Sequence, residues 1–368
     1  MSSTQRPPET TVQPRKKQAA YTFAVAGAWV AALLISIGFS IHFGLELVRF
    51  GSGERSPNPV SGEIKISLID WLGYYPFVVA DKKGFLDRRL DGTGVHVELY
   101  KAENTGEMND LIRTGKVHGT FGVLADFVIL QSLATPIRFV LATDYSKSDV
   151  IVAKKGITVP KDLRGKTIGI GELSSFAEYF TIRSLENAGV DRHSVSFRRV
   201  PPMEVPEAIQ AGKIDAGYTW EPALTRALAA GMNVVISSAT SPEMVISGLA
   251  FRDEVLVDPT ISAAIILAYY DGLAFYLENP NEFAAIVAEY FGTQASEISR
   301  IMTKDSLYID LQSNRKAFEP DGTVQKEMRT INRFFGERGI RQTDESVTTL
   351  LDPAPLLEAD RLSQVVDK

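Results

Sequence analysis

The sequence predicts an α/β protein of two lobes behind a single N-terminal transmembrane helix. Three observations lead to this prediction. The chain has 368 residues, which is enough for two domains of ordinary size or one large two-lobed domain. An uncharged segment of helical length, residues 21–41, follows a basic tail. From Glu63 onward, short strand-like runs alternate with segments of helical length, which is typical of α/β domains with mainly parallel strands.

The uncharged segment is long enough to cross a bilayer, because its 21 residues span about 30 Å as a helix. The preceding tail carries four basic residues against one acidic residue, which favours a cytoplasmic N-terminus with the rest of the chain outside. The segment also exceeds the apolar core of a cleaved signal peptide, about 7–15 residues. We therefore expect a cytoplasmic basic tail over 1–20, an uncleaved transmembrane anchor over 21–48 and a Gly/Pro/Ser-rich linker over 49–62.

The composition argues against several functional classes. Lys and Arg number 39 against 45 Asp and Glu, a net charge of −6, whereas a nucleic-acid binder needs positive charge opposite the phosphates. The chain has no cysteine, which removes disulfides, thiolate metal ligands and cysteine nucleophiles. Its four histidines lack paired metal-binding spacing, and no nucleotide-binding motif is present, so we expect neither a metal nor a cofactor.

The pattern after the linker predicts the order of strands and helices. Helix starts are indicated by Asn104 with Glu107 and by Ser175 with Glu178, which fit capping boxes, and Asp126 is interpreted as a helix N-cap. After residue 258 the pattern is mostly helical, without a strand signal. Strands are predicted at 64–69, 95–99, 119–124, 138–142, 150–154, 167–171, 194–199, 215–220 and 233–237, and late helices at 260–278, 280–291, 296–303 and 324–337.

Open α/β sheets bind ligands beyond the carboxyl ends of their strands, so the residues there are candidates for a site. Trp71 and Tyr74 follow the first strand, where aromatic rings either form a flat wall for a small ligand or pack in the core. Thr105 has a hydroxyl beside helix N–H groups that would suit an anion. Ala125 follows the third strand, where backbone groups are expected to face the crevice.

The second half of the domain supplies further candidates. Asp149 lies where the chain first crosses between the lobes, with a structural role as the default interpretation. Ser175 is expected to be occupied as a helix cap, which leaves Ser174 as the freer hydroxyl. Trp220 and Glu221 follow another strand, where Glu221 also suits a helix start. No lysine or arginine falls at these turns, which favours a zwitterion, a monoanion or an aromatic heterocycle over a doubly charged anion.

Catalytic interpretations lack support in the sequence. There is no G-x-S-x-G nucleophile elbow, no histidine beside a candidate serine at a strand end, and no carboxylate pair imposed by spacing. We therefore expect a binding protein and no enzyme.

Taken together, these residues resemble a known family, the substrate-binding proteins of ABC importers in the branch for nitrate, alkanesulfonates, taurine and thiamine pyrimidines. The resemblance implies a type II periplasmic-binding-protein fold over 63–360, with one lobe over about 63–147 plus 244–360 and the other over about 149–240. It implies binding turns at the candidates named above. The stretches that carry it are Trp71–Leu86, Gly156–Gly171, Ile209–Gly231 and Arg329–Ile340.

The resemblance implies a monomeric extracytoplasmic domain that delivers a small solute to an ABC permease and its ATPase, and the apolar segment at residues 21–48 leads us to expect that this domain is anchored in a bacterial inner membrane. Family members are usually cleaved soluble proteins or Cys-anchored lipoproteins, whereas this chain is expected to keep its helix. A tethered sensor or interaction subunit without a transported solute is therefore the alternative function. An enzyme acting on a small heterocycle is less well supported, because the related pyrimidine-forming enzymes depend on a cysteine-rich motif that is missing here.

Overall fold

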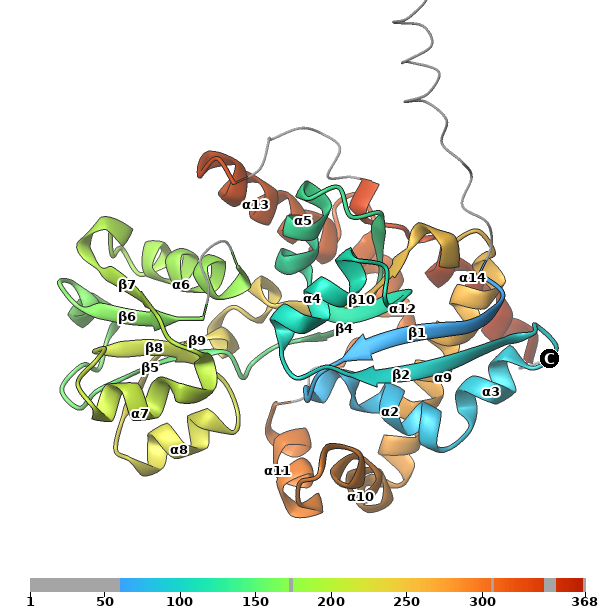
Figure 1. Cartoon of the computed structure of the whole chain (residues 1–368), viewed down its shortest axis with the longest axis horizontal. Helices are drawn as coiled ribbons and strands as arrows, with labels where there is room; N and C mark the ends of the chain where they lie inside the picture. Colours follow the sequence, from blue (N-terminus) through green and yellow to red (C-terminus); the bar gives the residue numbers. More distant parts are fainter. Residues whose placement is uncertain (1–59, 172–174, 306–307, 341–348, 367–368) are drawn as a thin grey trace, which may run out of the picture. The chain divides into compact units, whose positions relative to one another are not determined.

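The computed structural model describes residues 60–171, 175–305, 308–340 and 349–366 (Figure 1). The predicted tail and anchor, residues 1–48, lie outside the described residues, as does Ser174. Within the described ranges, α9 (Pro259–Glu278) is long and apolar enough to cross a membrane, but half of its apolar stretch is buried. Because α9 packs against α2 (Tyr75–Lys82), α3 (Phe85–Leu90) and α14 (Ala354–Val366), we interpret it as a core helix of the folded domain.

The strands form two separate five-stranded sheets. Sheet A has the order β2-β1-β3-β10-β4, and sheet B has the order β7-β6-β8-β5-β9. In each sheet four strands run one way and one strand, β10 or β5, runs the other way. The strands of sheet A are β1 (Gly62–Leu68), β2 (Val95–Lys101), β3 (Gly119–Val123), β4 (Ile137–Tyr145) and β10 (Ile246–Arg252); those of sheet B are β5 (Val150–Ala153), β6 (Thr167–Ile170), β7 (Ser196–Arg199), β8 (Ala216–Thr219) and β9 (Asn233–Ser237).

The antiparallel strand in each sheet is the first strand after the chain crosses from the other sheet. The first connection, residues 146–149, joins β4 to β5, and the second, residues 238–245, joins β9 to β10. The backbone N–H of Ser146 donates to the carbonyl of Val245 at 2.9 Å, so the two connections are hydrogen-bonded to each other. The nine predicted strands are all present, and β10 is a strand that the sequence did not reveal.

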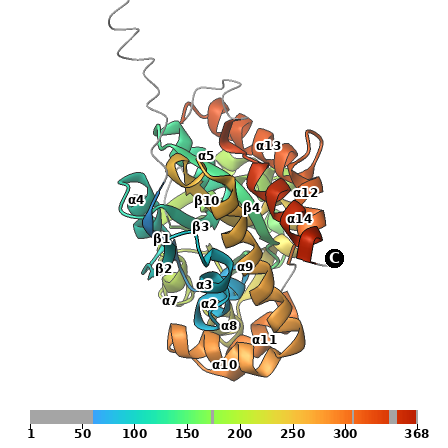
Figure 2. The same ribbon diagram turned by 90° about the vertical axis from the view of Figure 1, so that its right-hand side faces the viewer.

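Helices surround both sheets (Figures 1 and 2). The late helices α9, α10, α11 and α13 match the helical pattern predicted after residue 258, whereas α12 and α14 were not anticipated. The remaining bounds are α4 (Thr105–Arg113), α5 (Leu124–Ser132), α6 (Phe176–Asn187), α7 (Val205–Gln210), α8 (Ala223–Ala229), α10 (Pro280–Phe291), α11 (Ala295–Asp305), α12 (Leu311–Phe318) and α13 (Thr323–Glu337).

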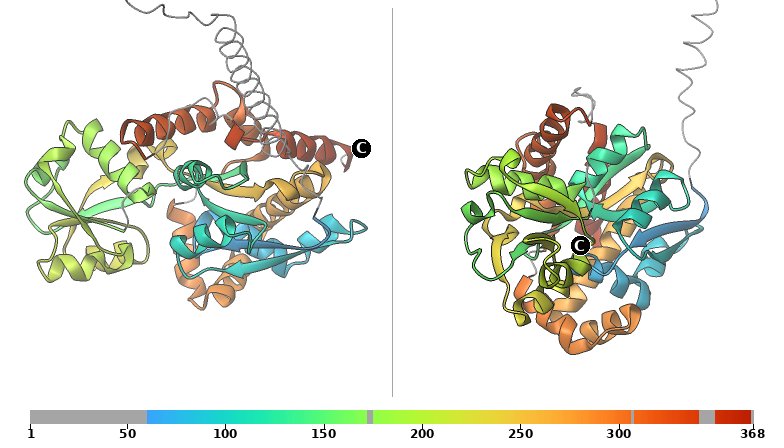
Figure 3. Two further views of the ribbon diagram at one scale, coloured as in Figure 1. Left: turned by 45° about the horizontal axis from the view of Figure 1, so that its top comes forward. Right: turned by 60° about the vertical axis from the view of Figure 1, so that its left-hand side comes forward.

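Helix α13 contacts helices on both sides of the connections (Figure 3). It packs against α5, which follows β3 of sheet A. Its aromatic rings also meet Tyr179 of α6, which follows β6 of sheet B: the ring centroid of Phe334 lies 5.0 Å from that of Tyr179, and that of Phe335 lies 6.2 Å away. The Tyr179 hydroxyl donates a hydrogen bond to the Glu327 carboxylate of α13. The C-terminal region therefore stabilises the arrangement of the two sheets.

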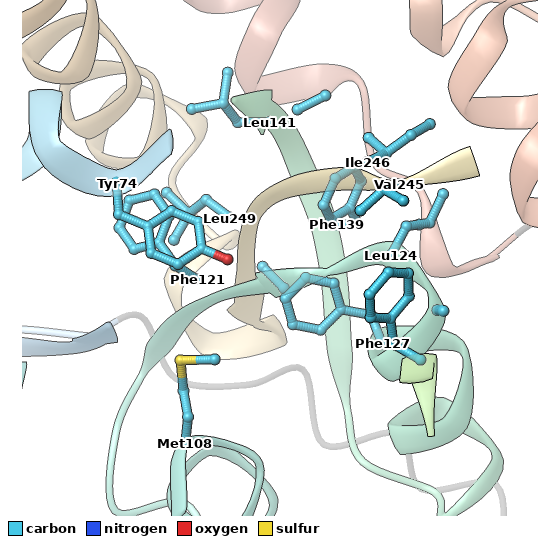
Figure 4. Close-up of a cluster of buried hydrophobic side chains, with 14 of the residues drawn as sticks. Tyr74, Met108, Phe121, Leu124, Phe127, Phe139, Leu141, Val245, Ile246 and Leu249 are labelled. Atoms are coloured by element: carbon cyan, nitrogen blue, oxygen red, sulfur yellow. The ribbon is translucent and has the colours of Figure 1, made fainter. Parts of the chain in front are cut away.

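Sheet A is held by a dense aromatic and aliphatic core (Figure 4). Phe121 of β3 and Phe139 of β4 are both completely buried. The ring of Phe127, from α5, lies 5.6 Å from that of Phe139, and the ring of Phe318, from α12, stacks on Phe139 at 5.7 Å. Burying such rings stabilises a fold by roughly 1.5–3 kcal/mol each. This core fixes the strand ends from which the candidate site is built.

Candidate functional site

The aromatic residues after β1 are positioned by a short 3₁₀ helix, η1 (Leu72–Tyr74). Trp71 precedes it, is partly exposed and packs against two buried apolar clusters, while its buried indole N–H lies close enough to Asp144 to lower the pKa of that carboxyl. Tyr74 is 3% exposed, and its ring centroid lies 4.7 Å from that of Phe121; Figure 4 shows both side chains among the buried cluster. Tyr74 is therefore a core residue, whereas Trp71 keeps an accessible part.

Beside these aromatics lies Asp144, a buried carboxylate that the sequence did not reveal. It lies in β4 opposite Ser247 of β10 and is fully buried. The hydroxyl of Thr143 donates to its Oδ1 at 3.0 Å. Burial raises the pKa of Asp144 to about 7, because desolvation disfavours the ionised form. Hydrogen bonding from the Thr143, Trp71 and Ser247 side chains lowers this pKa by smaller amounts, and the negative charge of Asp149 raises it.

Asp149 lies in the first connection and forms hydrogen bonds with three residues, Ser146, Tyr218 and Ser238. Its carboxylate accepts hydrogen bonds from the hydroxyls of Ser146 and of Tyr218, a residue of β8. Its backbone N–H donates to Ser238 Oγ at 3.1 Å, and its carbonyl accepts from the Ser238 N–H at 2.8 Å. Burial raises the pKa of Asp149 to about 6, and the hydroxyls of Ser146 and Tyr218 partly oppose this shift. Asp149 thus ties both connections to sheet B.

The start of α6 contributes the next part of the region. Ser175 is the N-cap of α6, and its hydroxyl accepts from the Glu178 N–H at 3.5 Å, as the capping pattern predicted. The next amide, of Phe176, donates to Asp126 Oδ1 at 3.1 Å. The interpretation of Asp126 as an N-cap is wrong, because α5 begins at Leu124 and Asp126 lies inside its first turn. The Asp126 carboxylate instead joins α5 to α6.

The turn after β8 places Trp220 and Glu221. Trp220 is partly exposed, and its ring centroid lies 5.5 Å from that of Tyr218. The Glu221 carboxylate accepts from the backbone N–H of Thr225 at 3.1 Å and from its hydroxyl at 2.7 Å. Arg300 of α11 lies 3.3 Å from the same carboxylate. Because these groups already engage Glu221, the geometry favours an orienting role for this side chain.

Two predicted site residues, Thr105 and Ala125, lie in the first turns of helices α4 and α5. Thr105 is the first residue of α4 and is exposed, beside Asn104, which caps the helix by accepting the Glu107 N–H at 3.0 Å. Ala125 lies in the first turn of α5 and is 2% exposed. Its side chain is a methyl group, so any polar contact between Ala125 and a ligand would involve the backbone, as the sequence predicted.

The region around the strand ends is acidic, and the described residues form no recognisable metal site. Within the described ranges, no group of three or more His, Cys, Asp or Glu side chains is arranged to hold a metal ion. The buried acidic residues are Asp126, Asp144, Asp149 and Glu178. The arrangement can therefore bind a small molecule through hydrogen bonds and aromatic contact. Because carboxylates accept hydrogen bonds, it is most complementary to groups that donate them.

A separate surface cavity of about 480 Å³ lies between α3 and α9. Two of its charged side chains are already engaged with each other: the Arg89 guanidinium donates two hydrogen bonds of 2.7 Å to Asp271. Arg88 lies 4.6 Å from the ring centroid of Phe85. Because these groups satisfy one another, the cavity is a weaker candidate for solute recognition than the strand ends.

Comparison with known proteins gives one curated relative and a set of shared folds. The chain is 24% identical over 259 residues to the taurine-binding periplasmic protein of Escherichia coli K12, which covers 67% of this chain and 79% of that protein. The periplasmic aliphatic sulphonate-binding protein SsuA of Escherichia coli superposes with a TM-score of 0.66 at 14% identity, covering 81% and 100% of the two chains. The periplasmic nitrate-binding protein NrtA of Synechocystis PCC 6803 gives 0.64 at 14% identity, covering 84% and 90%.

The same fold also occurs in an enzyme. The desulfurization enzyme DSZB superposes with a TM-score of 0.61 at 12% identity, covering 82% of this chain and 99% of that one. At such identities the likeness shows the fold alone, which receptors and an enzyme share. The two-sheet α/β architecture expected from the sequence is therefore confirmed as that of periplasmic binding proteins.

The family is decided by a sequence match. The model of the NMT1/THI5-like family matches residues 71–283, more than half of the chain. This range includes three of the four stretches that carried the resemblance, from Trp71 to Gly231, and both connections between the sheets. The chain belongs to the NMT1/THI5-like family.

Proposed function

We propose that this chain is the solute-binding component of an ABC importer for a small solute of the nitrate, sulfonate, taurine or thiamine-pyrimidine type. Family membership and the taurine-binding relative support the class. The observation that carries the proposal is the meeting of strand-end groups from both sheets at the two connections. Trp71 lies in the turn after β1, Asp144 lies in β4 of sheet A, Tyr218 lies in β8 of sheet B, and Asp149 lies in the first connection.

The mechanism is binding, with no bond made or broken. Two α/β lobes joined by short connections close on a ligand by hinge motion, and the hydrogen-bonded connections at Ser146 and Ser238 are the natural hinge. Of the three predicted aromatic residues, Trp71 and Trp220 would form the wall, whereas Tyr74 is buried in the core. Hydroxyls and backbone N–H groups would bind the polar part of the solute, with Thr105, Ser174 and Ser175 as the predicted hydroxyls, Ala125 as an apolar contact and Glu221 as an orienting group.

The proposed location is extracytoplasmic. Residues 21–48 would anchor the chain in a bacterial inner membrane with residues 1–20 in the cytoplasm, and the folded domain would meet the permease outside. Protease added to spheroplasts should digest the domain and leave an N-terminal tag before residue 21 protected. Digestion of that tag in intact spheroplasts, or release of the whole chain by osmotic shock, would contradict the anchored arrangement.

Thermal unfolding of the full-length chain tests solute binding directly. The panel holds taurine, alkanesulfonates, nitrate, bicarbonate, thiamine and its pyrimidines. A ligand at 100 times its dissociation constant stabilises the folded state by about 2.7 kcal/mol, which raises the unfolding midpoint by several degrees. A shift with one chemical class supports the receptor. The absence of a shift with every solute would favour the tethered sensor or interaction subunit.

Site variants test whether the ligand binds at the strand ends. Trp71→Ala and Glu221→Gln should each weaken binding at least tenfold, about 1.4 kcal/mol. Trp71 provides aromatic contact, and Glu221 holds the turn after β8 through Thr225. Tyr100→Ala is the matched control, because Tyr100 is a half-exposed aromatic on β2 that bonds Glu107 instead. Unchanged affinity in both site variants would place the ligand elsewhere.

A further inference from the structure

The turns at one end of sheet B form a basic surface. This end holds the starts of β6, β7, β8 and β9 and the end of β5, and Figure 1 shows that it faces away from sheet A. The turns there, residues 154–166, 188–195 and 211–215, carry a balance of +4 in a chain whose net charge is −6. We call this surface the basic end. Its charged residues are Lys154, Lys155, Lys161, Arg164, Lys166, Arg192 and Lys213 against Asp162, Asp191 and Asp215.

The acidic groups at the basic end are already engaged within the domain. Each of the three aspartates accepts hydrogen bonds of 2.9–3.1 Å from backbone N–H groups of the turns, and Asp215 also pairs with Lys154. Glu186, near the end of α6, is paired with two arginines. The surplus positive charge therefore faces solvent. Three of the lysines are exposed and form no ion pair within the described parts of the chain: Lys155, Lys161 and Lys213.

The turn after β5 presents an apolar residue among these charges. Ile157 is 4% exposed, and its carbonyl accepts from Asn233 Nδ2 at 3.0 Å, while the Asp162 carboxylate accepts the Val159 N–H at 3.1 Å. The turn is thus held by hydrogen bonds, yet the Val159 side chain is 49% exposed. Val159 also stands at the N-cap of the short helix η2 (Pro160–Leu163), where valine is strongly disfavoured. Neither packing nor capping explains an exposed valine here.

A second exposed valine lies close to this turn. Val234 of β9 is 37% exposed and directly follows Asn233, the residue bonded to the turn. Single exposed apolar side chains are ordinary, but apolar groups surrounded by lysines are typical of surfaces that contact an anionic bilayer. There the apolar groups enter the interface, and the ammonium groups meet lipid phosphates while the lysine stems lie along the apolar boundary.

The proposed anchoring favours a bilayer over an acidic protein as the partner of the basic end. The linker before Val60, residues 49–59, can reach at most about 40 Å, and a domain of this size has a radius of gyration of about 20 Å. Every face of the domain therefore stays near the membrane. The basic end also lies at the opposite end of the strands from the candidate site, so a partner bound there leaves the crevice open to a solute.

We propose that the basic end is a second membrane contact, in which Lys155, Lys161 and Lys213 bind the phosphates of anionic lipid headgroups and Val159 enters the interface. This inference goes beyond solute binding and relies only on the proposed location of the domain beside a bilayer.

A single fluorescent label tests the contact in the full-length chain. Because the chain has no cysteine, Val159→Cys provides the only thiol for an environment-sensitive fluorophore. The labelled chain is reconstituted with phosphatidylcholine vesicles that contain or lack phosphatidylglycerol, and doxyl lipids report lipid contact by quenching. The ratio of lipid-contacting to water-exposed label should rise about fivefold or more in the anionic vesicles, the effect of at least one lysine at such a surface. The rise should disappear at about 1 M salt, where the Debye length is about 3 Å.

Matched variants test whether position and charge matter. Lys155→Glu combined with Lys161→Glu should abolish the rise. Lys316→Glu combined with Lys326→Glu makes the same change of charge on exposed lysines of α12 and α13, and should keep it. A label at Leu277→Cys, an exposed position at the end of α9, should show no rise in anionic vesicles.

The outcomes separate this inference from the proposed function. Equal lipid contact in neutral and anionic vesicles, or a rise that survives in the Lys155→Glu, Lys161→Glu variant, overturns the lipid contact. A label that meets lipid in neither vesicle also overturns it and makes an acidic protein the partner of this surface. Flotation with neutral vesicles reports the anchor, and the solute-induced shift of the unfolding midpoint reports solute binding, so a failure of either is seen separately. The vesicle and salt comparisons use one labelled chain, so they decide the question even if the charge-reversed variant fails to fold.

Discussion

The hydroxyl of Tyr218, on a strand of sheet B, donates a hydrogen bond to the carboxylate of Asp149 in the first connection between the sheets. Tyr218 is 3% exposed, and its ring packs between Phe180 and Trp220. The same Asp149 carboxylate accepts from Ser146. One buried carboxylate therefore fixes the direction in which the chain enters sheet B, and it does so beside the candidate site.

Replacing Tyr218 with phenylalanine should weaken this junction. Tyr218→Phe keeps the ring but leaves one oxygen of Asp149 unpartnered, which should lower the free energy of unfolding by about 1.5–3 kcal/mol. Because the Tyr218 hydroxyl lowers the pKa of Asp149, that pKa should rise further. Urea unfolding measures the first effect, and NMR titration of the carboxyl carbon measures the second.

Tyr276→Phe is the control for this prediction, because Tyr276 is partly buried against Phe283 and Tyr308, away from Asp149. It should change the stability by much less and leave the Asp149 titration as it is. Equal losses in the two variants would show that the Tyr218 hydroxyl has no special role at the connection.

The stability of the domain should depend on the ionisation of Asp144. Its pKa is about 7 in the folded chain against a usual value of 3.8, so between these values the folded state binds a proton that the unfolded state has released. Stability from this group therefore falls as the pH rises from about 4 to 7. The stability of Asp144→Asn relative to the unmodified chain should improve by on the order of 1–3 kcal/mol between pH 5 and pH 8.

Asp162→Asn is the control for the sign of this effect. Backbone N–H groups of Thr158 and Val159 lower the pKa of Asp162, so its stabilisation is fully present above its usual pKa and is lost only as the pH falls. The difference between Asp162→Asn and the unmodified chain should be the same at pH 5 and pH 8. A pH-independent difference for Asp144→Asn as well would mean that Asp144 is not protonated in the folded chain.

Gly73 should tolerate no side chain, because Asp144 occupies the space beside it. A Cβ at Gly73 would lie 1.8 Å from Asp144 Oδ1 and 3.1 Å from Thr143 Oγ1. Gly73→Ala must therefore displace the buried carboxylate, and we expect a loss of about 1–3 kcal/mol or more in chemical denaturation. Gly106→Ala, where the nearest atom is a side-chain oxygen of Asn104 at 3.1 Å, should cost less. Comparable losses would indicate that Asp144 moves aside freely.

The ion pair between Arg300 and Glu221 should contribute little to stability, although it joins α11 to the turn after β8. The atoms are 3.3 Å apart; the Arg300 side chain is 42% exposed, whereas that of Glu221 is 7% exposed. Because solvent reaches the Arg300 side of the pair, we expect it to behave like exposed pairs, which contribute about 0–1 kcal/mol and are screened by salt. A double-mutant cycle with Arg300→Gln and Glu221→Gln should give a coupling energy of roughly 0.5 kcal/mol at low salt, and none at 1 M salt. A coupling that persists at 1 M salt would show that the pair is effectively buried.

The sequence by itself determined the features that depend on neighbouring residues. Short apolar runs located nine strands, some with alternating burial, as in Val95–Lys101, and others buried throughout, as in Val150–Ala153. Asn104 and Ser175 were recognised as helix caps from their spacing to Glu107 and Glu178, and the structure contains both caps. The position of Trp71 at a strand end followed from the same local pattern. A helix cap or a strand depends on a few neighbouring side chains, so it can be predicted from the sequence without knowledge of the fold.

Tertiary structure decided the features that join distant segments. The predicted strand at 138–142 continues in β4 to Tyr145, because β10 pairs with it and aligns Ser247 with Asp144. That pairing puts a carboxylate, which local sequence would assign to an exposed loop, into the core beside Trp71. Likewise, Asp126 accepts an amide of α6 instead of capping its own helix, and Arg300 reaches Glu221 across 79 positions of sequence. Burial and charge pairing depend on these long-range contacts, because only the assembled sheets remove water from both sides of such groups.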